Sequence, residues 1–238
     1  RFVLELGADK LGFITYEKSP RKIDFEKIEN IKSELSLDGE KMVAVEVEPT
    51  IEHLKKIMDQ GFGVFQLHFS YDLSRDLIGQ WSQLVGAENL WLAPRLPKGV
   101  SFPEDLFSYS KTFLIDAYSE SKFGGTGERS DWESFSALQH SFSTKKWILA
   151  GGLSQDNIHL AIKSTNAEIV DVNSGVERSP GVKDHGKLKK FFSELTFDKI
   201  SKAIKENLIE RFESLMDVLG YVGTAFKNRM NNKRQKNT

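Results

Sequence analysis

Seven short apolar segments recur along the first 172 residues, and amphipathic segments separate most of them. The apolar segments do not alternate with polar residues, which is typical of parallel strands buried on both faces. The predicted strands are 11–15, 42–47, 64–68, 90–93, 112–116, 147–150 and 168–172. The predicted helices, which have apolar residues at helical spacing, are 24–35, 51–58, 73–85, 132–140 and 157–163. Strands joined by helical crossovers predict a parallel α/β sheet.

Two α/β architectures fit this alternation. An open doubly wound sheet is one, but no G-x-G-x-x-G motif follows the first strand, which weakens its dinucleotide-binding version. The other is the eight-stranded (β/α)8 TIM barrel, for which 238 residues is an ordinary length. The chain shows one strand too few for the barrel and opens in a helix-like pattern. We therefore expect a TIM barrel whose first strand lies before Arg1.

The pattern changes near residue 197. Apolar residues recur at three- and four-residue steps from Ile200 to Leu219, and a polar, basic tail follows. We expect a barrel domain over residues 1–196 and an amphipathic helix with a solvated tail over residues 197–238. Acidic residues interrupt any basic face of this helix, which disfavours a membrane-surface role.

Composition narrows the function classes. The net charge of -1 offers no electrostatic reason for a nucleic-acid partner. The absence of cysteine excludes disulfides, thiolate metal sites and thiol catalysis within this chain. The five histidines lack ligand spacing, so no metal site is predicted. With no signal peptide and no apolar stretch near the roughly 20 residues of a membrane span, a cytoplasmic protein without a membrane partner is expected.

Ionisable residues follow several of the predicted strands. Arg21 lies in the loop after the first strand, while His68, Asp116 and Asp171 each lie at the end of a later one. Each has a structural explanation when taken alone, as a surface arginine, a rim histidine or a loop-ordering acid, and Arg95 is interpreted as structural. The active site of a parallel barrel lies at the carboxyl ends of its strands. The coincidence of these groups at that rim favours a catalytic site.

Two glycine-containing loops follow the last two strands. Gly151 and Gly152 lie in one loop, and Ser174 and Gly175 lie in the other. Glycines let backbone N–H groups approach an anion closely, and a hydroxyl can add a further donor. Barrel enzymes frequently bind phosphate in the loops after their last two strands. The pair of loops therefore predicts a phosphate site.

Five stretches resemble, in order, the motifs of the phosphoribosylanthranilate isomerase family. They are GADKLGFITYEKSPRKI, FQLHF, FLIDAYSESKFGGTGERSDW, ILAGGLSQDNI and IVDVNSGVERSPGVKD. The resemblance covers about residues 1–195 and is most specific over 171–184. It implies a TIM barrel that converts N-(5'-phosphoribosyl)anthranilate to 1-(2-carboxyphenylamino)-1-deoxyribulose 5-phosphate, by a cofactor-free Amadori rearrangement in tryptophan biosynthesis.

The resemblance also implies roles for the rim residues. Asp116 would be the general acid that protonates the furanose ring oxygen. Arg21 would contact the anthranilate end of the substrate, and His68 and Asp171 would line the pocket. The two glycine-containing loops would hold the ribose phosphate. The expected partner is this small phosphoribosyl substrate, and the expected assembly is a monomer or a homodimer.

The sequence departs from the family pattern at three points. The family's first strand carries the cysteine that acts as general base, so we expect the base upstream of Arg1 and leave open the activity of this cysteine-free chain. Phe69 stands where glycine is usual, which would narrow the pocket, and Asn173 stands at a common serine. Two alternatives stay open. One is an inactive phosphate-binding barrel that serves as an interaction subunit, and the other is a different sugar-phosphate enzyme, such as an epimerase or a lyase.

Overall fold

A computed structural model describes residues 1–97, 99–116 and 131–196 of the chain. The chain divides into two units, Arg1–Glu194 and Leu195–Thr238, and the fold described below is that of the first. The helix and tail predicted for residues 197–238 lie outside the described residues.

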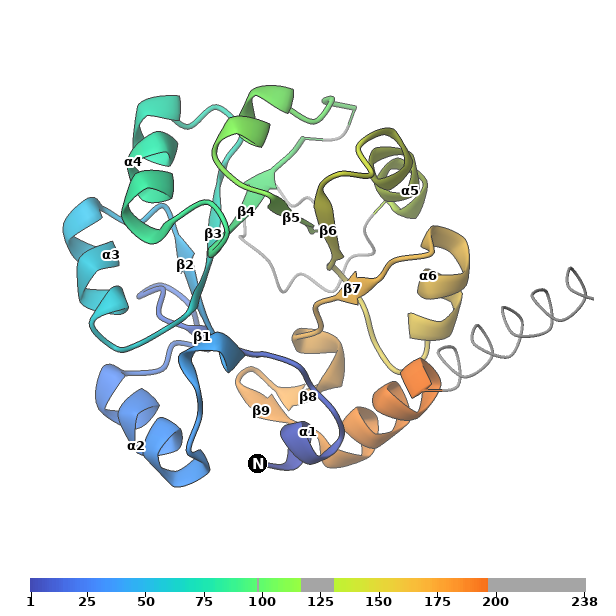
Figure 1. Ribbon diagram of the computed structural model, residues 1–238. Helices are drawn as coiled ribbons and strands as arrows, with labels where there is room; N and C mark the ends of the chain where they lie inside the picture. Colours follow the sequence, from blue (N-terminus) through green and yellow to red (C-terminus); the bar gives the residue numbers. More distant parts are fainter. Residues whose placement is uncertain (98, 117–130, 197–238) are drawn as a thin grey trace, which may run out of the picture. The chain divides into compact units, whose positions relative to one another are not determined.

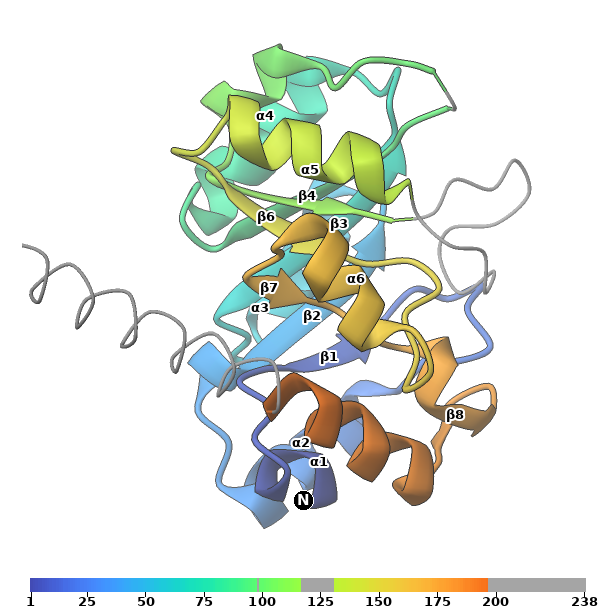
Figure 2. The ribbon, with the colours of Figure 1, turned by 90° about the vertical axis from the view of Figure 1, so that its right-hand side faces the viewer.

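Seven parallel strands form one sheet, in which each strand pairs with its neighbours in the sequence (Figure 1). The strands are β1 (Leu11–Ile14), β2 (Met42–Val47), β3 (Val64–Ser70), β4 (Leu90–Arg95), β5 (Thr112–Ile115), β6 (Lys146–Leu149) and β7 (Ile169–Val170). The sheet curls about its own axis, and the helices lie on its outer side (Figures 1 and 2). The predicted α/β barrel fold is thus confirmed.

The helices that link the strands agree with the amphipathic pattern. The helices are α1 (Phe2–Glu5), α2 (Phe25–Leu35), α3 (Ile51–Met58), α4 (Arg75–Val85), α5 (Trp132–Ser141) and α6 (Ile158–Thr165), with 3-10 turns η1 (Gly39–Lys41), η2 (Glu104–Ser108) and η3 (Ser174–Val176). Every strand and helix predicted between residues 11 and 172 is present, with bounds within two residues of the prediction. The hairpin of β8 (Glu177–Ser179) and β9 (Val182–Lys183), and the helical residues 185–196, were not predicted.

Side chains alternate between two apolar layers, because successive strand residues point to opposite faces. Inside the curled sheet, the small core cluster of Ala93, Leu114, Ile148 and Ala150 packs together. The other face packs on the helix layer, where rings meet edge to face. The rings are those of Phe69 with Trp81 on α4, and of Phe102 and Phe107 with Phe113. This alternation fixes which residues at the strand ends face the interior.

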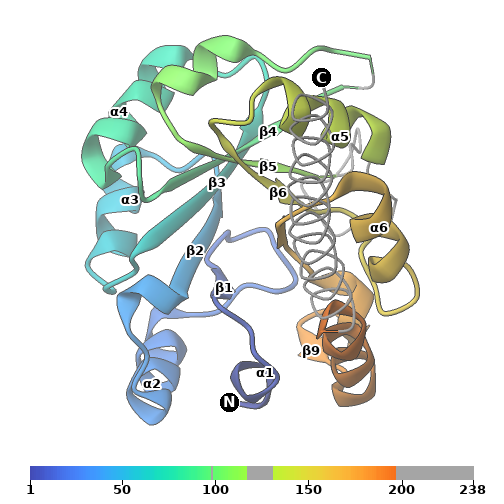
Figure 3. The same cartoon turned by 45° about the vertical axis from the view of Figure 1, so that its right-hand side comes forward.

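The first and last strands of the sheet, β1 and β7, each have one strand neighbour among the described residues. Side chains connect the segments that flank them. The ring of Phe2 in α1 stacks on His185, with centroids 4.1 Å apart, and α1 lies beside the helical segment that follows β9 (Figures 1 and 3). Arg21, after β1, pairs with Glu177 of β8. These contacts bring the loop after β1 and the segment after β7 to one place on the rim.

In the part of the chain that the structure describes, no helix has both the length and the apolar character needed to cross a membrane.

Candidate active site

The interior face of the sheet carries the predicted ionisable residues at the rim. His68 lies in β3 opposite Ala93, a member of the interior cluster. Asp116 follows Leu114 by two residues and Asp171 follows Ile169 by two, so strand alternation continues the interior face to both carboxylates. Three of the predicted site residues therefore belong to one face of one rim.

Gln66 joins two of these residues. Its Nε2 lies 3.1 Å from Nε2 of His68 and 3.3 Å from Oδ2 of Asp171. Because an amide nitrogen only donates, the imidazole Nε2 accepts here. Gln66 was not predicted as a site residue. Because it precedes His68 by two residues in an apolar strand, it lies on the same face of that strand.

Removal from water controls the ionisation of this group. Burial lowers the pKa of His68 to about 4, so the imidazole is neutral at pH 7 and can accept a hydrogen bond. Burial also raises the pKa of Asp171, against the opposing effects of the Gln66 hydrogen bond and the Lys183 charge. The neutral imidazole of His68 and the amide of Gln66 therefore give the interior lining uncharged polar groups, which suit contacts with hydroxyl groups.

Arg21 and Glu177 form a largely buried ion pair at the rim. Arg21 Nε donates to Oε1 and Oε2 of Glu177 at 3.1 and 2.9 Å, and Nη2 donates to Oε2 at 2.8 Å. The two side chains are 15% and 4% exposed, so little water competes for these bonds. Arg21 is thus placed at the rim as predicted, but its partner was not foreseen.

Lys183 of β9 completes this charged cluster. Its Nζ lies 3.1 Å from Glu177 Oε1, 2.8 Å from the Asn173 carbonyl oxygen and 2.6 Å from Asn173 Oδ1. Burial lowers the pKa of Lys183, and the Glu177 carboxylate counteracts this effect. The asparagine that replaces the common serine therefore has a structural role, because its side chain anchors the lysine.

The two glycine-containing loops touch each other. A Cβ added at Gly175 would lie 1.9 Å from the carbonyl oxygen of Leu153, so only glycine permits this approach. Gly151 and Gly152 have φ values of 83° and 63°, in the left-handed region that favours glycine. The loops after β6 and β7 thus form one surface at the rim.

Asn157 braces the first of these loops. Its side-chain amide donates to the Gly152 carbonyl oxygen at 2.8 Å and accepts from the Ser154 N–H at 2.8 Å. The loop leads into α6, whose amino-terminal end adds a favourable dipole for an anion. The geometry therefore suits the predicted phosphate site at Gly151, Gly152, Ser174 and Gly175, and that role stays a prediction.

Asp116 begins next to this surface. β5 and β6 pair with Ile115 opposite Leu149, and the Ala150 N–H donates to the Ile115 carbonyl oxygen at 2.9 Å. The backbone of Asp116 consequently continues beside Ala150 and Gly151. The predicted acid and the first glycine-containing loop are therefore neighbours at the edge of the sheet.

Phe69 does not narrow the site, contrary to the expectation from the sequence. It is fully buried on the face that packs against the helices, with its ring centroid 5.9 Å from that of Trp81. Strand alternation explains this, because Phe69 follows the interior-facing His68 directly.

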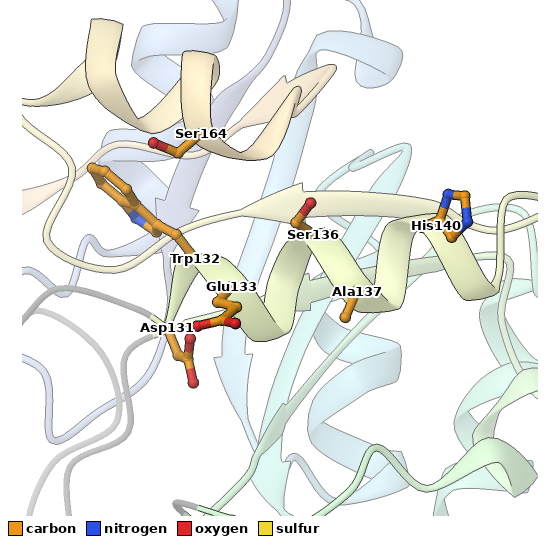
Figure 4. Close-up of a pocket in the computed structure, with 7 residues that line it drawn as sticks. All are labelled: Asp131, Trp132, Glu133, Ser136, Ala137, His140 and Ser164. Atoms are coloured by element: carbon orange, nitrogen blue, oxygen red, sulfur yellow. The ribbon is translucent and has the colours of Figure 1, made fainter.

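A surface hollow of about 630 Å³ lies elsewhere, on α5 and α6 (Figure 4). It is lined by Asp131, Trp132, Glu133, Ser136, Ala137, His140 and Ser164. The Asp131 carboxylate already caps α5 by accepting from the Ser134 N–H at 3.1 Å. The hollow contains none of the predicted site residues, and we assign no ligand to it.

No group of three or more metal-ligating side chains occurs among residues 1–97, 99–116 and 131–196. The interior carboxylate and imidazole have an amide partner, and the Glu177 carboxylate has two cations.

Comparison with known proteins identifies a family that this chain matches. The family model described as N-(5'phosphoribosyl)anthranilate (PRA) isomerase matches residues 2–194. A relative of that name from Sulfurihydrogenibium is 36% identical over 197 residues, which cover 80% of this chain and 90% of the relative.

Solved structures agree with this match. Phosphoribosyl anthranilate isomerase from Thermus thermophilus has a TM-score of 0.65 at 25% identity, covering 82% of this chain and 91% of that one. A second isomerase structure, in complex with reduced 1-(o-carboxyphenylamino)-1-deoxyribulose 5-phosphate, has a TM-score of 0.60 at 27% identity, covering 81% and 90% of the two chains.

Proposed function

Because this chain belongs to the N-(5'-phosphoribosyl)anthranilate isomerase family, we propose that its rim catalyses the Amadori rearrangement of N-(5'-phosphoribosyl)anthranilate. The product is 1-(2-carboxyphenylamino)-1-deoxyribulose 5-phosphate, and the step belongs to tryptophan biosynthesis. The observation that carries the assignment of the site is the composition of the rim. A cationic cluster and a backbone-lined anion surface flank interior carboxylates, which matches a substrate with a carboxylate at one end and a phosphate at the other.

The phosphate end is assigned to the touching loops after β6 and β7. The close approach of Gly175 to Leu153 supports this assignment, because it joins the two loops into one surface of backbone groups. Backbone N–H groups and a helix amino terminus bind phosphate without a lysine or arginine. Ser174 would add a hydroxyl donor to the amides of Gly151, Gly152 and Gly175. Phosphate binding there would fix the sugar relative to the acid.

The anthranilate end is assigned to Arg21. Its guanidinium has five N–H donors, and Glu177 engages only the Nε and Nη2 groups. A guanidinium edge binds a planar carboxylate with two parallel hydrogen bonds. His68 and Asp171 would line the space between the two ends and contact the sugar hydroxyls.

Asp116 is assigned as the general acid. Its proton goes to the furanose ring oxygen, the bond from C1' to that oxygen breaks, and the nitrogen lone pair forms the C=N bond of a Schiff base. Loss of the C2' proton to a base gives an enolamine, which tautomerises to the ketone, so that the net change is an isomerisation. A placed acid typically contributes about 10²- to 10⁴-fold to the rate.

Replacement of the acid tests this assignment. Asp116→Asn should lower turnover by at least about 10²-fold, measured by anthranilate fluorescence. Affinity for the reduced product analogue should be retained, because the two ends of the ligand keep their contacts. Asp59→Asn, at the exposed end of α3, is the matched control and should leave turnover unchanged. Normal turnover by Asp116→Asn would remove the residue from the acid role.

We also infer that the protein acts in the cytoplasm as a monomer or homodimer, without a cofactor or a nucleic-acid partner. The near-neutral charge supports the last point, since nucleic-acid binding requires a basic surface. Light scattering coupled to size-exclusion chromatography measures the assembly directly, and a stable tetramer would contradict the inference.

A further inference from the structure

The guanidinium of Arg21 is held along one edge only. Nε and Nη2 face the Glu177 carboxylate at 2.8 to 3.1 Å, while Nη1 has no hydrogen-bond partner among the described residues. Arginine's donors lie in one plane, so fixing the Nε edge also fixes the direction of the Nη1–Nη2 edge. A carboxylate that approaches this second edge would meet two N–H groups in a preset geometry.

Glu177 is in turn held from its other side. Its Oε1 accepts from Lys183 Nζ at 3.1 Å and from the Gly181 N–H at 3.3 Å, and its carbonyl oxygen accepts from Lys187 Nζ at 2.7 Å. The hairpin turn also lies against the loop after β1, because a Cβ at Gly181 would be 3.9 Å from the Pro20 carbonyl oxygen. These contacts hold the Glu177 carboxylate in place independently of Arg21.

The electrostatics of the cluster keep the Glu177 carboxylate ionised. Burial alone would raise the pKa of Glu177, but the Arg21 hydrogen bonds and the Lys183 charge outweigh it and lower that pKa. Glu177 is thus anionic at neutral pH and pairs with the Nε edge of the Arg21 guanidinium. The second edge of this cation remains directed away from Glu177, where a carboxylate could meet it.

We propose that Glu177 is a positioning residue that orients the open edge of Arg21 for the aromatic carboxylate of the substrate. The inference rests on the proposed function and assigns a specificity to the same site. Glu177 does not touch the ligand, and it acts by keeping the arginine plane fixed before binding. The cluster thereby selects an arylamine that carries a carboxylate over one that does not.

Binding of two ligands separates this role from a structural one. The first ligand is reduced 1-(o-carboxyphenylamino)-1-deoxyribulose 5-phosphate, and the second is its phenylamino counterpart without the carboxylate. Calorimetry gives the dissociation constant of each, and their ratio is the carboxylate preference. A bidentate charge-assisted pair predicts a preference of at least about tenfold in the unaltered protein.

Glu177→Gln should reduce this preference about tenfold, because a neutral amide holds the guanidinium less firmly. Affinity for the ligand without the carboxylate should change less than about twofold. Glu177→Asp keeps the charge but retracts it by one methylene. Its carboxylate preference should lie between those of the unaltered protein and of Glu177→Gln. Glu88→Gln is the matched control, since it breaks an exposed pair with Lys111 and should alter neither affinity.

A double-mutant cycle with Arg21→Lys tests whether Glu177 acts through the arginine. In the Arg21→Lys background, Glu177→Gln should no longer alter the carboxylate preference, because the planar edge is already absent. The same loss in both backgrounds, or equal weakening of both ligands by Glu177→Gln, would overturn the positioning role.

The proposed function fails in a different way. In that case the unaltered protein would bind neither ligand or would show no carboxylate preference, which would overturn the positioning role as well. A preference that survives Glu177→Gln at full size would overturn only the positioning role and leave the proposed function in place.

Discussion

Asp171 and Glu177 are carboxylates six residues apart at the same rim, yet their pKa values are shifted in opposite directions. The pKa of Asp171 is raised, chiefly by burial. The pKa of Glu177 is lowered, although burial acts on it in the same upward direction. The difference lies in their partners. Glu177 contacts a guanidinium and an ammonium directly, whereas Asp171 accepts from a neutral amide at 3.3 Å and receives only a coulombic effect from Lys183.

Burial therefore determines the direction of the pKa shift only where no cation contacts the carboxylate. The difference in partners also separates two kinds of chemistry within one site. The Glu177 side of the rim keeps its charges paired and suits the recognition of a charged group. On the Asp171 side, the neutral imidazole of His68 and the amide of Gln66 are the polar neighbours of the carboxylate. Both kinds depend on the segment from β7 to β9, which carries both carboxylates.

Removal of Arg21 should give the largest effect on stability. Arg21→Met leaves Glu177 buried with Lys183 as its remaining cation, and loss of one partner of a buried pair costs about 3 kcal/mol. Urea unfolding monitored by tryptophan fluorescence measures this change in the free energy of unfolding. Arg178→Met, at an exposed position of β8, is the matched control and should cost less than about 0.5 kcal/mol. Equal losses from the two variants would mean that the pair with Glu177 contributes nothing to stability.

The same pair predicts an acid-sensitive contribution. The folded pKa of Glu177 lies below its ordinary value of 4.5, so the stability that it contributes is fully present above pH 4.5. This contribution is lost as the pH falls through the folded pKa. The gap between Arg21→Met and the unaltered protein should therefore shrink below pH 4.5. A gap that is constant from pH 7 to pH 3 would contradict the lowered pKa.

Lys183→Met should have a smaller effect and should sharpen the contrast between the carboxylates. The lysine side chain is 40% exposed, so its removal should cost about 1 kcal/mol of unfolding free energy. Loss of its positive charge should raise the pKa values of both Asp171 and Glu177, but only Glu177 keeps a direct cation. Carbon-13 NMR titration of the carboxyl groups measures both values, and an unchanged Asp171 would exclude the lysine effect.

Much of the fold could be predicted from the sequence, because its strands and helices depend on local patterns. Buried parallel strands are continuous apolar runs, and the helices between them repeat at three- and four-residue steps, so both are visible within short windows. The placement of His68, Asp116 and Asp171 at strand ends followed from the same windows. Strand alternation alone could also have placed Gln66 on the interior face beside His68.

The partners of these residues could not be predicted in the same way. Arg21 and Glu177 are 156 residues apart in the chain, and no local pattern pairs them. The short β8–β9 hairpin also lacks a clear strand signal. Glu46 is a further example, because it interrupts an apolar strand and yet is buried. Its Oε2 accepts from Thr15 Oγ1 at 2.9 Å and lies 3.1 Å from His53 Nε2. Such pairings arise only when distant segments meet.

Asp171→Asn should give the smallest effect and the opposite sign to Arg21→Met. The folded pKa of Asp171 lies above its ordinary value of 3.8, so its favourable contribution is fully present below pH 3.8 and is lost as the pH rises through the folded pKa. An asparagine of the same shape can still accept from Gln66, and it lacks the burial cost that an aspartate acquires as it ionises. Urea unfolding should then show a gain between zero and about 1 kcal/mol at pH 7, which disappears or reverses at pH 3.5. A loss of about 3 kcal/mol at pH 7, the size expected for Arg21→Met, would show that the Asp171 carboxylate is paired like Glu177, and the contrast between the two would not hold.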